Sequence, residues 1–269
     1  MIRVAISGVA GRIGSLMANL ALDDKKCRVV GALEAPGHAA LGQDLGQFLG
    51  RPTTQVVITE DAASALADAD VLIEFTSPEA TLQHARAAAT HRVTMVIGTT
   101  GLNAAQEGEL RRLSRRTAIL HSPNMSLGVL IVRRMLAEAA RVMTACGLDR
   151  GVAFQIVETH HVHKKDRPSG TAKLLATEIA RVFPKQARPV PIESRREGEV
   201  VGIHEILLAF GDERIRLEHD AQSRRIFAQG ALVVAKFLVE RLGRKPGFYD
   251  MDAFAQHLLA AMIHRRRSR

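Results

Sequence analysis

The alternation of short apolar runs with stretches of helical periodicity constrains the fold of this chain more than any other feature. Residues 2–7 place apolar side chains at every second position, as a strand does, and the apolar residues from Ile13 to Leu20 then recur at helical spacing. The same change repeats, with strand-like runs at 28–34, 55–58, 70–75, 93–98 and 117–122 and helical runs near 62–67, 79–90 and 104–115. This alternation predicts a doubly wound parallel sheet with right-handed crossovers.

The pattern changes after about Asn124, which predicts a second domain. A long helical run covers residues 127–145, and an extended run follows at 152–161. Two later strand-like runs, 199–210 and 213–220, are separated by a Gly-Asp dipeptide, which is typical of a hairpin. We therefore expect an α+β domain that contains an antiparallel hairpin.

The end of the chain combines helical periodicity with a basic tail. The helical pattern runs from about Ile226 to Ile263, is broken at 243–250, and could pack on either domain. The formal net charge of +9 falls to +5 when the four arginines of the tail are subtracted, namely Arg265, Arg266, Arg267 and Arg269. Such a tail is usually solvated and disordered, and no aromatic stacking platform accompanies it, so we expect no nucleic-acid partner. An anionic substrate or cofactor better explains the remaining charge.

Composition narrows the class of protein further. The chain has 269 residues, of which 46% are hydrophobic, so a sizeable buried core is expected. No run approaches the roughly 20 apolar residues of a membrane span, and the start reads as a strand entering a glycine turn rather than a signal peptide. We therefore expect a cytoplasmic protein without a membrane partner. Cys27 and Cys146 form no CxxC pair, so neither a disulfide framework nor a thiolate metal site is predicted.

A glycine loop joins the first strand to the first helix. Gly8, Gly11 and Gly14 have the spacing GxxGxxG, which permits a tight turn and close approach of a pyrophosphate to a helix N-terminus. Glu34 ends the second strand 20 residues after Gly14, where a carboxylate can accept hydrogen bonds from ribose hydroxyls. The alternatives are a turn that needs glycine for its geometry alone and an ordinary surface carboxylate. We favour a dinucleotide site.

The sequence gives weaker indications of the choice between NADH and NADPH and of the residues around the nicotinamide. A carboxylate repels a 2′-phosphate and Ala35 follows Glu34, so the pattern leans towards NADH, although Arg12 could reach such a phosphate and allow NADPH. Two turns follow later strands and could line the nicotinamide end, unless Gly and Asn serve only local geometry there. The predicted cofactor residues are Gly8, Gly11, Arg12, Ile13, Gly14, Glu34, Phe75, Gly98, Thr99, Thr100, Ser122, Pro123, Asn124 and Met125.

The run "ETHHVHKKDRPSGTA", residues 158–172, admits three interpretations. His161 and His163 would share one face of a strand, as metal ligands can, but the run brings no carboxylate or Cys at a familiar zinc spacing, so we predict no metal. A solvated basic face is the plainer alternative. Acid catalysis explains more of the residues, because a histidine can deliver a proton near neutral pH.

The end of this run predicts a place for an anion. Residues 168–171, Pro-Ser-Gly-Thr, form a turn into a helix whose apolar side carries Leu174, Leu175, Glu178 and Ile179. Free amides at that helix N-terminus, with the Ser and Thr hydroxyls, make a cradle of carboxylate size, and Lys164 adds a positive charge. A small substrate with carboxylates would suit this site.

These residues resemble a known family signature. The pattern E-x-H-H-x-x-K-x-D-x-P-S-G-T-A, here residues 158–172, is similar to that of the 4-hydroxy-tetrahydrodipicolinate reductases, also called dihydrodipicolinate reductases, of bacterial lysine biosynthesis. The blocks "GVAGRIG", "GTTG", "SPNMSLGV", "SRREGEVVGIHEI", "SRRIFAQGA" and "GFYDM" resemble the same family in order, nearly from end to end. One departure is Ala35, at a position that is often basic in the family.

The resemblance implies a domain layout and roles for particular residues. A Rossmann-like dinucleotide-binding domain would comprise 1–124 and 225–269, and residues 125–224 would form the domain for substrate binding and assembly of a homotetramer. NAD(P)H would reduce a cyclic, doubly carboxylated imine, formed from the hydroxylated substrate by loss of water, to tetrahydrodipicolinate. His160 matches the general acid and Lys164 the cationic partner of substrate and proton transfer. The remaining matches are substrate-binding groups, His161, Ser169, Gly170 and Thr171.

Two other kinds of protein share parts of this pattern. Another two-domain NAD(P)-dependent dehydrogenase, such as one acting on an amino-acid aldehyde, would carry the same glycine loop. A regulator that senses the dinucleotide without chemistry would also keep the fold. The run at 158–172 argues against both. Another dehydrogenase would share the glycine loop but not this run, and a sensor needs no proton donor such as His160 beside a cation such as Lys164.

Overall fold

The computed structural model describes residues 1–185 and 189–267, and its contacts divide the chain into two compact units. The first unit comprises Met1–Met125 and Phe227–Arg269, and the second comprises Ser126–Ile226. Within the described residues, no helix is both long and apolar enough to cross a membrane. The side chains of the arginine tail lie outside the described residues.

The first unit is built on a parallel sheet, as the alternating pattern predicts. Its seven strands have the order β11-β6-β5-β4-β1-β2-β3, and every pairing between them is parallel. The strands are β1 (Ile2–Ser7), β2 (Cys27–Leu33), β3 (Ile58–Thr59), β4 (Val71–Glu74), β5 (Thr94–Ile97), β6 (Ala118–His121) and β11 (Gly247–Tyr249). The strand order reverses direction at β1, so the carboxyl ends of β1 and β4 border the crevice where doubly wound sheets bind ligands.

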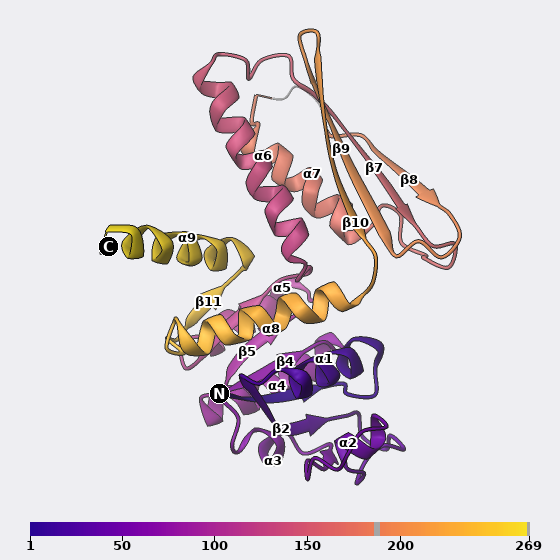
Figure 1. The fold of residues 1–269 in the computed structure, drawn as a ribbon, viewed down its shortest axis with the longest axis vertical. Coiled ribbons are helices and arrows are strands. Elements are labelled where there is room, and N and C mark those ends of the chain that lie inside the picture. Colours follow the sequence, from indigo (N-terminus) through magenta and orange to yellow (C-terminus); the bar gives the residue numbers. More distant parts are fainter. Residues whose placement is uncertain (186–188, 268–269) are drawn as a thin grey trace. The chain divides into compact units, whose positions relative to one another are not determined.

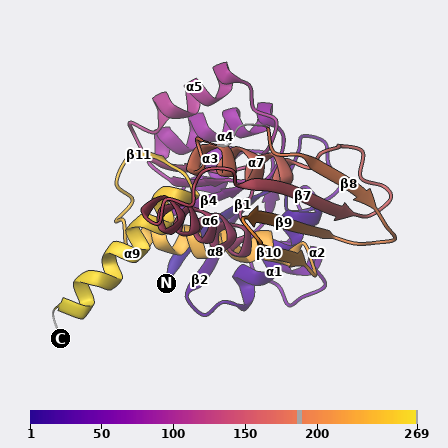
Figure 2. The ribbon, with the colours of Figure 1, turned by 90° about the horizontal axis from the view of Figure 1, so that it is seen from above.

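Helices cover both faces of this sheet. The helices of the first unit are α1 (Arg12–Asp23), α2 (Leu45–Phe48), α3 (Ala62–Leu66), α4 (Pro78–His91), α5 (Ala104–Leu113), α8 (Arg225–Glu240) and α9 (Met251–Arg267), and five of them, α1, α3, α4, α5 and α8, lie on the faces of the sheet. Figure 2 shows α3, α4 and α5 gathered on one side of the strands and α1 and α8 on the other. Leu66, Ala85 and Leu110 from the first group are buried against Leu72 and Met95 of the sheet. The doubly wound fold is thereby confirmed.

The second unit packs two helices on one face of a mixed sheet (Figure 1). The sheet order is β10-β9-β7-β8, with β9 antiparallel to both of its neighbours and β8 parallel to β7. The elements are α6 (Leu127–Ala145), β7 (Ala153–His160), α7 (Gly170–Val182), β8 (Ile192–Arg196), β9 (Gly202–Phe210) and β10 (Glu213–Ala221). The predicted hairpin is confirmed as β9 and β10, which turn at Gly211 with a positive φ of 51°.

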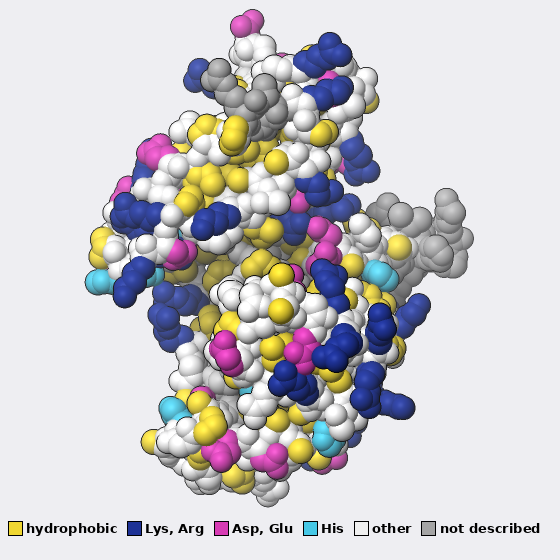
Figure 3. Space-filling view, turned by 180° about the vertical axis from the view of Figure 1, so that it is seen from behind, with side chains coloured by type: hydrophobic (Ala, Val, Ile, Leu, Met, Phe, Trp, Pro, Cys, Tyr) yellow, Lys and Arg dark blue, Asp and Glu magenta, His cyan; other side chains and the backbone are white. Residues whose placement is uncertain are grey.

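Positively and negatively charged side chains are both present on the face drawn in Figure 3. Lys and Arg side chains are spread among acidic and apolar ones over this face. Elsewhere in the described residues and irrespective of this view, acidic groups form ion pairs with arginines, such as Glu109 with Arg86 at 2.8 Å and Glu193 with Arg195 at 2.8 Å. Part of the positive charge of the chain is therefore neutralised locally.

Candidate functional site

The glycine loop of the first unit leaves a helix N-terminus open to a ligand. Gly8 follows β1 with a φ of 63°, and α1 begins at Arg12 after Gly11, which has no side chain with which to cap the helix. A Cβ atom at Gly14 would lie 1.9 Å from the carbonyl oxygen of Gly8, so glycine is needed where the helix meets the loop. Uncapped amides at a helix N-terminus suit a phosphate group, and the residues present therefore fit a dinucleotide.

Glu34 is fixed against this loop. Its Oε2 accepts a hydrogen bond from the Ala10 amide at 2.8 Å, and its Oε1 accepts one from the Ala35 amide at 2.9 Å. These two bonds distinguish Glu34 from a freely solvated surface carboxylate. Each oxygen keeps a second lone pair, with which it can accept a further hydrogen bond from a hydroxyl group.

Residues 75 and 76 lie between the glycine loop and the turn after β5. A Cβ atom on Gly98 would lie 2.1 Å from the Phe75 ring, and one on Gly8 would lie 3.1 Å from Cγ2 of Thr76. The structure therefore brings together four of the predicted cofactor residues, namely Gly8, Phe75, Gly98 and Thr99. The Phe75 ring lies against Gly98, and the Thr99 hydroxyl accepts a hydrogen bond at 3.1 Å from the amide of Thr76, the residue that lies beside Gly8. Glycine at position 98 is required by the close approach of the ring.

A buried polar cluster is hydrogen-bonded to Thr99, in the turn after β5. The carboxylate of Glu74, at the end of β4, is fully buried and lies 2.7 Å from Nδ1 of His84 and 3.3 Å from the hydroxyl of Thr81. The Thr81 hydroxyl in turn donates to the Thr99 hydroxyl at 2.8 Å. Glu74, Thr81 and His84 were not predicted as part of the site, because each reads as an ordinary strand or helix residue in the sequence.

The turn after β6 lies beside a pocket in the first unit. Ser122 fixes its own turn by donating to the carbonyl oxygen of Asn124 at 2.8 Å, and Met125 is buried. The pocket has a volume of about 390 Å³ and is lined by Thr100 and Pro123 from the two predicted turns. Phe248 and Tyr249, from the block "GFYDM", complete one wall. Both predicted turns therefore contribute to one pocket. The sequence indicated Phe248 and Tyr249 only because they belong to a block that resembles the family.

In the second unit, a polar row crosses the buried face of the sheet. The register places Ser194, Glu158, His204 and His219 side by side on four neighbouring strands. The adjacent row is apolar and includes Ile156, which is fully buried. The core face of the sheet thus changes from apolar to polar at the end that carries the predicted histidines.

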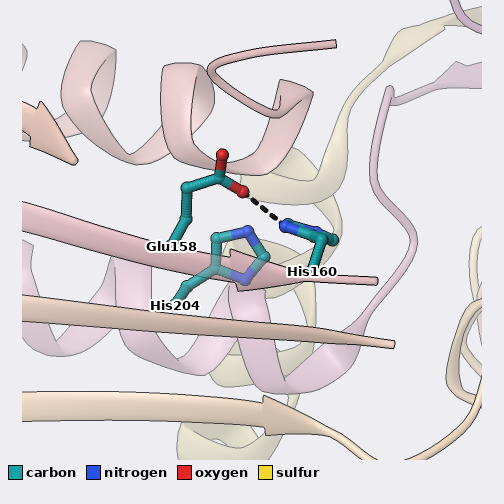
Figure 4. A group of neighbouring side chains, drawn as sticks. All are labelled: Glu158, His160 and His204. Carbon is teal, nitrogen blue, oxygen red and sulfur yellow. Dashed lines mark ion pairs between the residues drawn. The ribbon is translucent and has the colours of Figure 1, made fainter. Parts of the chain in front are cut away.

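Glu158 and His160 form a buried pair within this region (Figure 4). Oε2 of Glu158 contacts Nδ1 of His160, and Oε1 accepts a hydrogen bond from Arg196 at 3.1 Å. Burial alone would raise the pKa of Glu158, but hydrogen bonds from Ser194 and Arg196 and the nearby His160 outweigh it, and the pKa is lowered. Glu158 is therefore ionised at neutral pH.

The acidity of His160 is set by opposing influences. The side chain is only 9% exposed, and this burial is the strongest single influence and lowers its pKa, whereas the carboxylate of Glu158 raises it. The positive charge of Lys164 lowers the pKa further. A Cβ atom on Gly202 would lie 2.9 Å from Nε2 of His160, so the glycine leaves room for the edge of the ring that faces away from Glu158.

Lys164 lies on the loop that follows the strand. Its Nζ atom forms an ion pair with Asp166 at 2.7 Å, which contributes to a lowered pKa of that carboxyl although burial opposes it. The loop is tied to the sheet by Arg196, which donates to the carbonyl oxygens of Lys164 at 3.2 Å and Asp166 at 2.6 Å. Arg196 thus holds both the loop and Glu158, a role that the sequence did not reveal because Arg196 belongs to a distant strand.

The predicted anion cradle is the N-terminus of α7. Ser169 is its N-cap residue, and the hydroxyl accepts a hydrogen bond from the Ala172 amide and lies 3.1 Å from Nε2 of His204. Apart from its neighbours along the chain and the backbone of its own helix, no atom of the described residues lies within 4 Å of a Cβ built on Gly170, so space is open beside the helix start. Thr171 follows in the first turn of the helix. This geometry can accept a carboxylate at backbone amides.

The remaining histidines of the run differ in their surroundings. Nε2 of His161 lies 3.4 Å from the guanidinium of Arg224, a cation from a distant part of the chain that was not predicted as part of the site. His163 is 74% exposed and lies 3.4 Å from Glu199, which is also exposed. The structure therefore separates His163, a solvated residue, from His160.

One set of side chains has the donor types of a metal site. Glu158, His160 and His204 each offer a ligand atom, and these atoms lie within 4.8 Å of one another. Sequence spacing could not indicate this set, because His204 comes from another strand. Oε1 of Glu158 already accepts from Arg196, Oε2 forms an ion pair with His160, and Nε2 of His204 lies beside Ser169. Nδ1 of His204 has no hydrogen-bond partner among the described residues. The ion pair and the two hydrogen bonds engage all three side chains, and we derive no metal-dependent step.

A doubly wound sheet with an uncapped glycine loop, together with a unit that holds a buried histidine near a helix N-terminus, defines a two-domain, dinucleotide-dependent oxidoreductase. Comparison with family models specifies which one. The model described as dihydrodipicolinate reductase, N-terminus, matches residues 2–125, and the C-terminal model of the same family matches residues 128–254. The chain belongs to the dihydrodipicolinate reductase family, whose reductases use NAD(P)H.

Individual relatives agree with this family. The chain is 36% identical to the 4-hydroxy-tetrahydrodipicolinate reductase of Janthinobacterium sp. over 93% of its length and 97% of the relative. It is 38% identical to that of Burkholderia thailandensis over 93% and 96%. A dipicolinate-bound dihydrodipicolinate reductase from Paenisporosarcina sp. shares the fold with a TM-score of 0.74, 24% identity and coverage of 93% and 97%. An amine dehydrogenase from Mycobacterium smegmatis shares it with a TM-score of 0.65, 16% identity and coverage of 94% and 95%.

Proposed function

We propose that this protein reduces 4-hydroxy-tetrahydrodipicolinate, by way of dihydrodipicolinate, to tetrahydrodipicolinate in lysine and diaminopimelate biosynthesis, with NAD(P)H as the reductant. The observation that carries the proposal is the buried pair of Glu158 and His160, which lies near Lys164 and the open N-terminus of α7. The names of the relatives support the reaction, and the dipicolinate bound by the Paenisporosarcina enzyme is a dicarboxylate.

The first unit would hold the cofactor. Bound NAD(P)H supplies a hydride to the conjugated imine of the substrate. The amides at the start of α1 would bind its pyrophosphate, and Glu34 would accept hydrogen bonds from the adenosine ribose. The carboxylate of Glu34 and the absence of a cation at Ala35 favour NADH, whereas Arg12 could bind a 2′-phosphate and permit NADPH. The other predicted cofactor residues, including Phe75 and the two turns, would enclose the nicotinamide end.

His160 would deliver the proton that completes the reduction. Hydride addition leaves electron density on the substrate ring, which a positioned acid must quench. Because Nδ1 of His160 is directed at the ionised Glu158, a neutral ring carries its proton there and Nε2 has none to give. The acid is therefore the imidazolium, which burial disfavours and which Glu158 and an anionic substrate both stabilise.

The carboxylates of the substrate would be bound by cationic and amide groups. Lys164 would exchange part of its contact with Asp166 for a substrate carboxylate, a charge-assisted hydrogen bond worth about 1.5–3 kcal/mol. The N-terminus of α7, with Ser169, Gly170 and Thr171, would bind a carboxylate through its backbone dipoles. His161 would contribute beside Arg224.

The organisation of the protein in the cell belongs to the same proposal. Residues 1–124 and 225–269 would form the dinucleotide-binding domain, and residues 125–224 would bind the substrate and form the interface of a homotetramer. The resemblance to the family supports both assignments. A biosynthetic reaction with a diffusible dicarboxylate substrate supports a cytoplasmic location without a membrane or nucleic-acid partner.

A coupled assay tests the reaction and the acid together. The substrate would be generated from pyruvate and aspartate semialdehyde by the preceding synthase, and oxidation of NADH and of NADPH would be followed separately. We expect turnover in the wild type and a loss of about 10²- to 10⁴-fold in kcat for His160→Ala, with cofactor binding intact. His163→Ala is the matched control, because that histidine is exposed, and it should retain full activity.

Two outcomes would contradict the proposal. A wild-type protein that binds a dinucleotide but oxidises neither cofactor would be a sensor or a dehydrogenase with another substrate. Equal losses in His160→Ala and His161→Ala, confined to KM, would show that His160 binds the substrate and does not protonate it.

A further inference from the structure

Two histidines that face each other across β9 and β10 contact the start of the two helices of the second unit. His204 and His219 are direct neighbours in the antiparallel register. Nε2 of His204 lies 3.1 Å from the hydroxyl of Ser169, and Nε2 of His219 lies 3.3 Å from the hydroxyl of Ser126. These serines are the N-cap residues of α7 and α6. Each helix start is thus bonded to the sheet through a histidine.

The Ser169 hydroxyl has a hydrogen that it can donate to the His204 ring. The Ser169 oxygen accepts the amide hydrogen of Ala172 at 3.1 Å, so its own hydrogen is available to donate to Nε2 of His204. His204 is 5% exposed, and burial, with His160 and His219 nearby, lowers its pKa to about 3. The ring is neutral near pH 7, and its Nδ1 has no hydrogen-bond partner among the described residues. In the tautomer with the proton on Nδ1, Nε2 of His204 accepts from Ser169, and this second bond fixes the orientation of the cap.

This bond determines what the helix start can offer to an anion. Because the Ser169 hydroxyl is engaged by Ala172 and His204, its contribution to a bound carboxylate comes through the backbone. A carboxylate would occupy the open space beside Gly170 and bind the amides of the first turn. The position of that turn relative to the sheet is fixed by His204.

His204 also borders the proton donor. Its ring meets the ring of His160 edge to face, with centroids 5.1 Å apart, and it lies directly across the strand pair from Glu158 (Figure 4). A cation at this position would repel the imidazolium of His160, whereas a neutral ring does not. The same side chain therefore contacts the residue that would protonate the substrate and the cap of the helix that would bind its carboxylate.

We propose that His204 is a positioning residue that holds the N-terminus of α7 in place for a substrate carboxylate, next to His160. The inference rests on the proposed function, and it goes further by assigning a task to a residue outside the histidine run. It predicts that losing the acceptor at Nε2 of His204 weakens carboxylate binding more than it slows the chemical step.

Paired substitutions test this role. His204→Met removes the acceptor and keeps much of the volume, whereas His204→Gln places an amide oxygen near the position of Nε2 and can still accept from Ser169. The probe is dipicolinate, with its binding measured by calorimetry, and KM and kcat are measured in the coupled assay. We expect His204→Met to weaken dipicolinate binding and to raise KM about 3- to 10-fold, the equivalent of one hydrogen bond. His204→Gln should recover most of this loss.

Matched controls separate positioning from general stability. His219→Met removes the corresponding contact at the cap of α6 and should leave dipicolinate binding unchanged. If His204→Met does not fold, Ser169→Ala removes the same hydrogen bond from its other end. If both variants fold, the double variant should bind dipicolinate no more weakly than the single variant with the lower affinity. Hydrogen exchange at the Ala172 amide should accelerate in both single variants, and affinity for NADH should not change.

The outcomes distinguish this inference from the proposed reaction. Dipicolinate binding requires no turnover, so a wild type that binds dipicolinate but does not reduce the substrate would overturn the reaction alone. Unchanged dipicolinate affinity and KM in both His204→Met and Ser169→Ala would overturn the role of His204. Equal losses in His204→Gln and His204→Met, or a wild type that does not bind dipicolinate, would also overturn it.

Discussion

At the scale of single residues, His160 shows how a buried acid can be tuned by its neighbours. Burial lowers its pKa from the usual value of 6.5, Lys164 lowers it further, and Glu158 raises it. In the free protein the imidazolium is therefore the minority form near neutral pH. If the imidazolium is the acid, kcat/KM must fall as the pH rises through the pKa of His160.

Replacing Glu158 tests this dependence. Glu158→Gln removes the negative partner that favours the imidazolium, so the pKa of His160 should fall and the decline of kcat/KM should move to lower pH. The measurement is the pH profile of kcat/KM for wild type and variant. Glu199→Gln is the control, since Glu199 pairs only with the exposed His163 among the described residues, and its profile should match the wild type. A superimposable profile for Glu158→Gln would show that the carboxylate does not tune the acid.

The residue after Glu34 decides the cofactor in our interpretation. Ala35→Arg would place a guanidinium where a 2′-phosphate could bind, and a charge-assisted hydrogen bond of about 1.5–3 kcal/mol corresponds to about a 10- to 100-fold gain in kcat/KM for NADPH. Steady-state kinetics with both cofactors measures the change. Ala35→Gln adds length without charge and should gain much less. A preference unmoved by Ala35→Arg would place the discrimination elsewhere, with Arg12 as the next residue to replace.

The sequence indicated local parts of the candidate site and missed the distant ones. His160, Lys164 and Ser169 lie within one short run, so their types and spacing could be interpreted together. His204 and Arg196 stand on other strands, and only the register of the sheet brings them next to Glu158. Pairing between strands is set by long-range packing, which a linear pattern does not reveal.

At the scale of elements, α6 and α7 are joined by a buried ion pair. Glu178 was predicted on the apolar side of its helix, and the structure explains why a carboxylate is tolerated there. Its Oε2 lies 3.0 Å from the guanidinium of Arg133 on α6, and both side chains are largely buried. Burial opposes the charge, but Arg181 and Arg133 outweigh it, and the pKa of Glu178 is lowered.

This pair predicts both a cost of substitution and a dependence on pH. Glu178→Ala leaves Arg133 without this partner, and removing one member of a buried pair typically costs about 3–5 kcal/mol of unfolding free energy. Because the folded pKa lies below the unfolded value of about 4.5, the stabilisation is present above that pH and is lost as the pH falls through the folded pKa. Chemical denaturation at several pH values measures both effects. Glu138→Ala breaks an exposed pair with Arg141 and should cost less than about 1 kcal/mol.

Long elements with a regular apolar spacing could be predicted from the sequence, whereas short elements that depend on distant partners could not. The helix predicted at 127–145 has those bounds in the structure, because its apolar spacing is regular over many turns and Ser126 caps its start. The short elements α2, β8 and β11 were missed. Strand β8 has alternating charged residues on an exposed face, and β11 has three residues whose pairing depends on the distant β6. Local pattern carries little information about such segments.

At the scale of the whole molecule, the end of the chain returns to the first unit. Strand β11 pairs with β6 at the edge of the parallel sheet, and α8 buries a continuous apolar face that includes Leu232, Val234 and Leu238. Arg244 reaches back to Asp70, which also pairs with Arg3, and Lys236 contacts Asp24. The sequence pattern alone left the partner of this segment open, because an amphipathic helix does not specify which sheet it covers.

Truncation tests how far the first unit depends on that segment. A chain ending at residue 224 lacks α8, β11 and α9, and fully burying a single Leu or Val side chain contributes about 1.5–3 kcal/mol, so losing several of them exceeds the whole stability of a typical domain. We expect this variant to show no cooperative unfolding transition for the first unit and no NADH binding. Deleting only residues 265–269 is the matched control and should leave turnover, NADH affinity and thermal unfolding unchanged. If the longer truncation still binds NADH with full affinity, the sheet is stable without α8, and the C-terminal segment must serve another purpose, such as assembly.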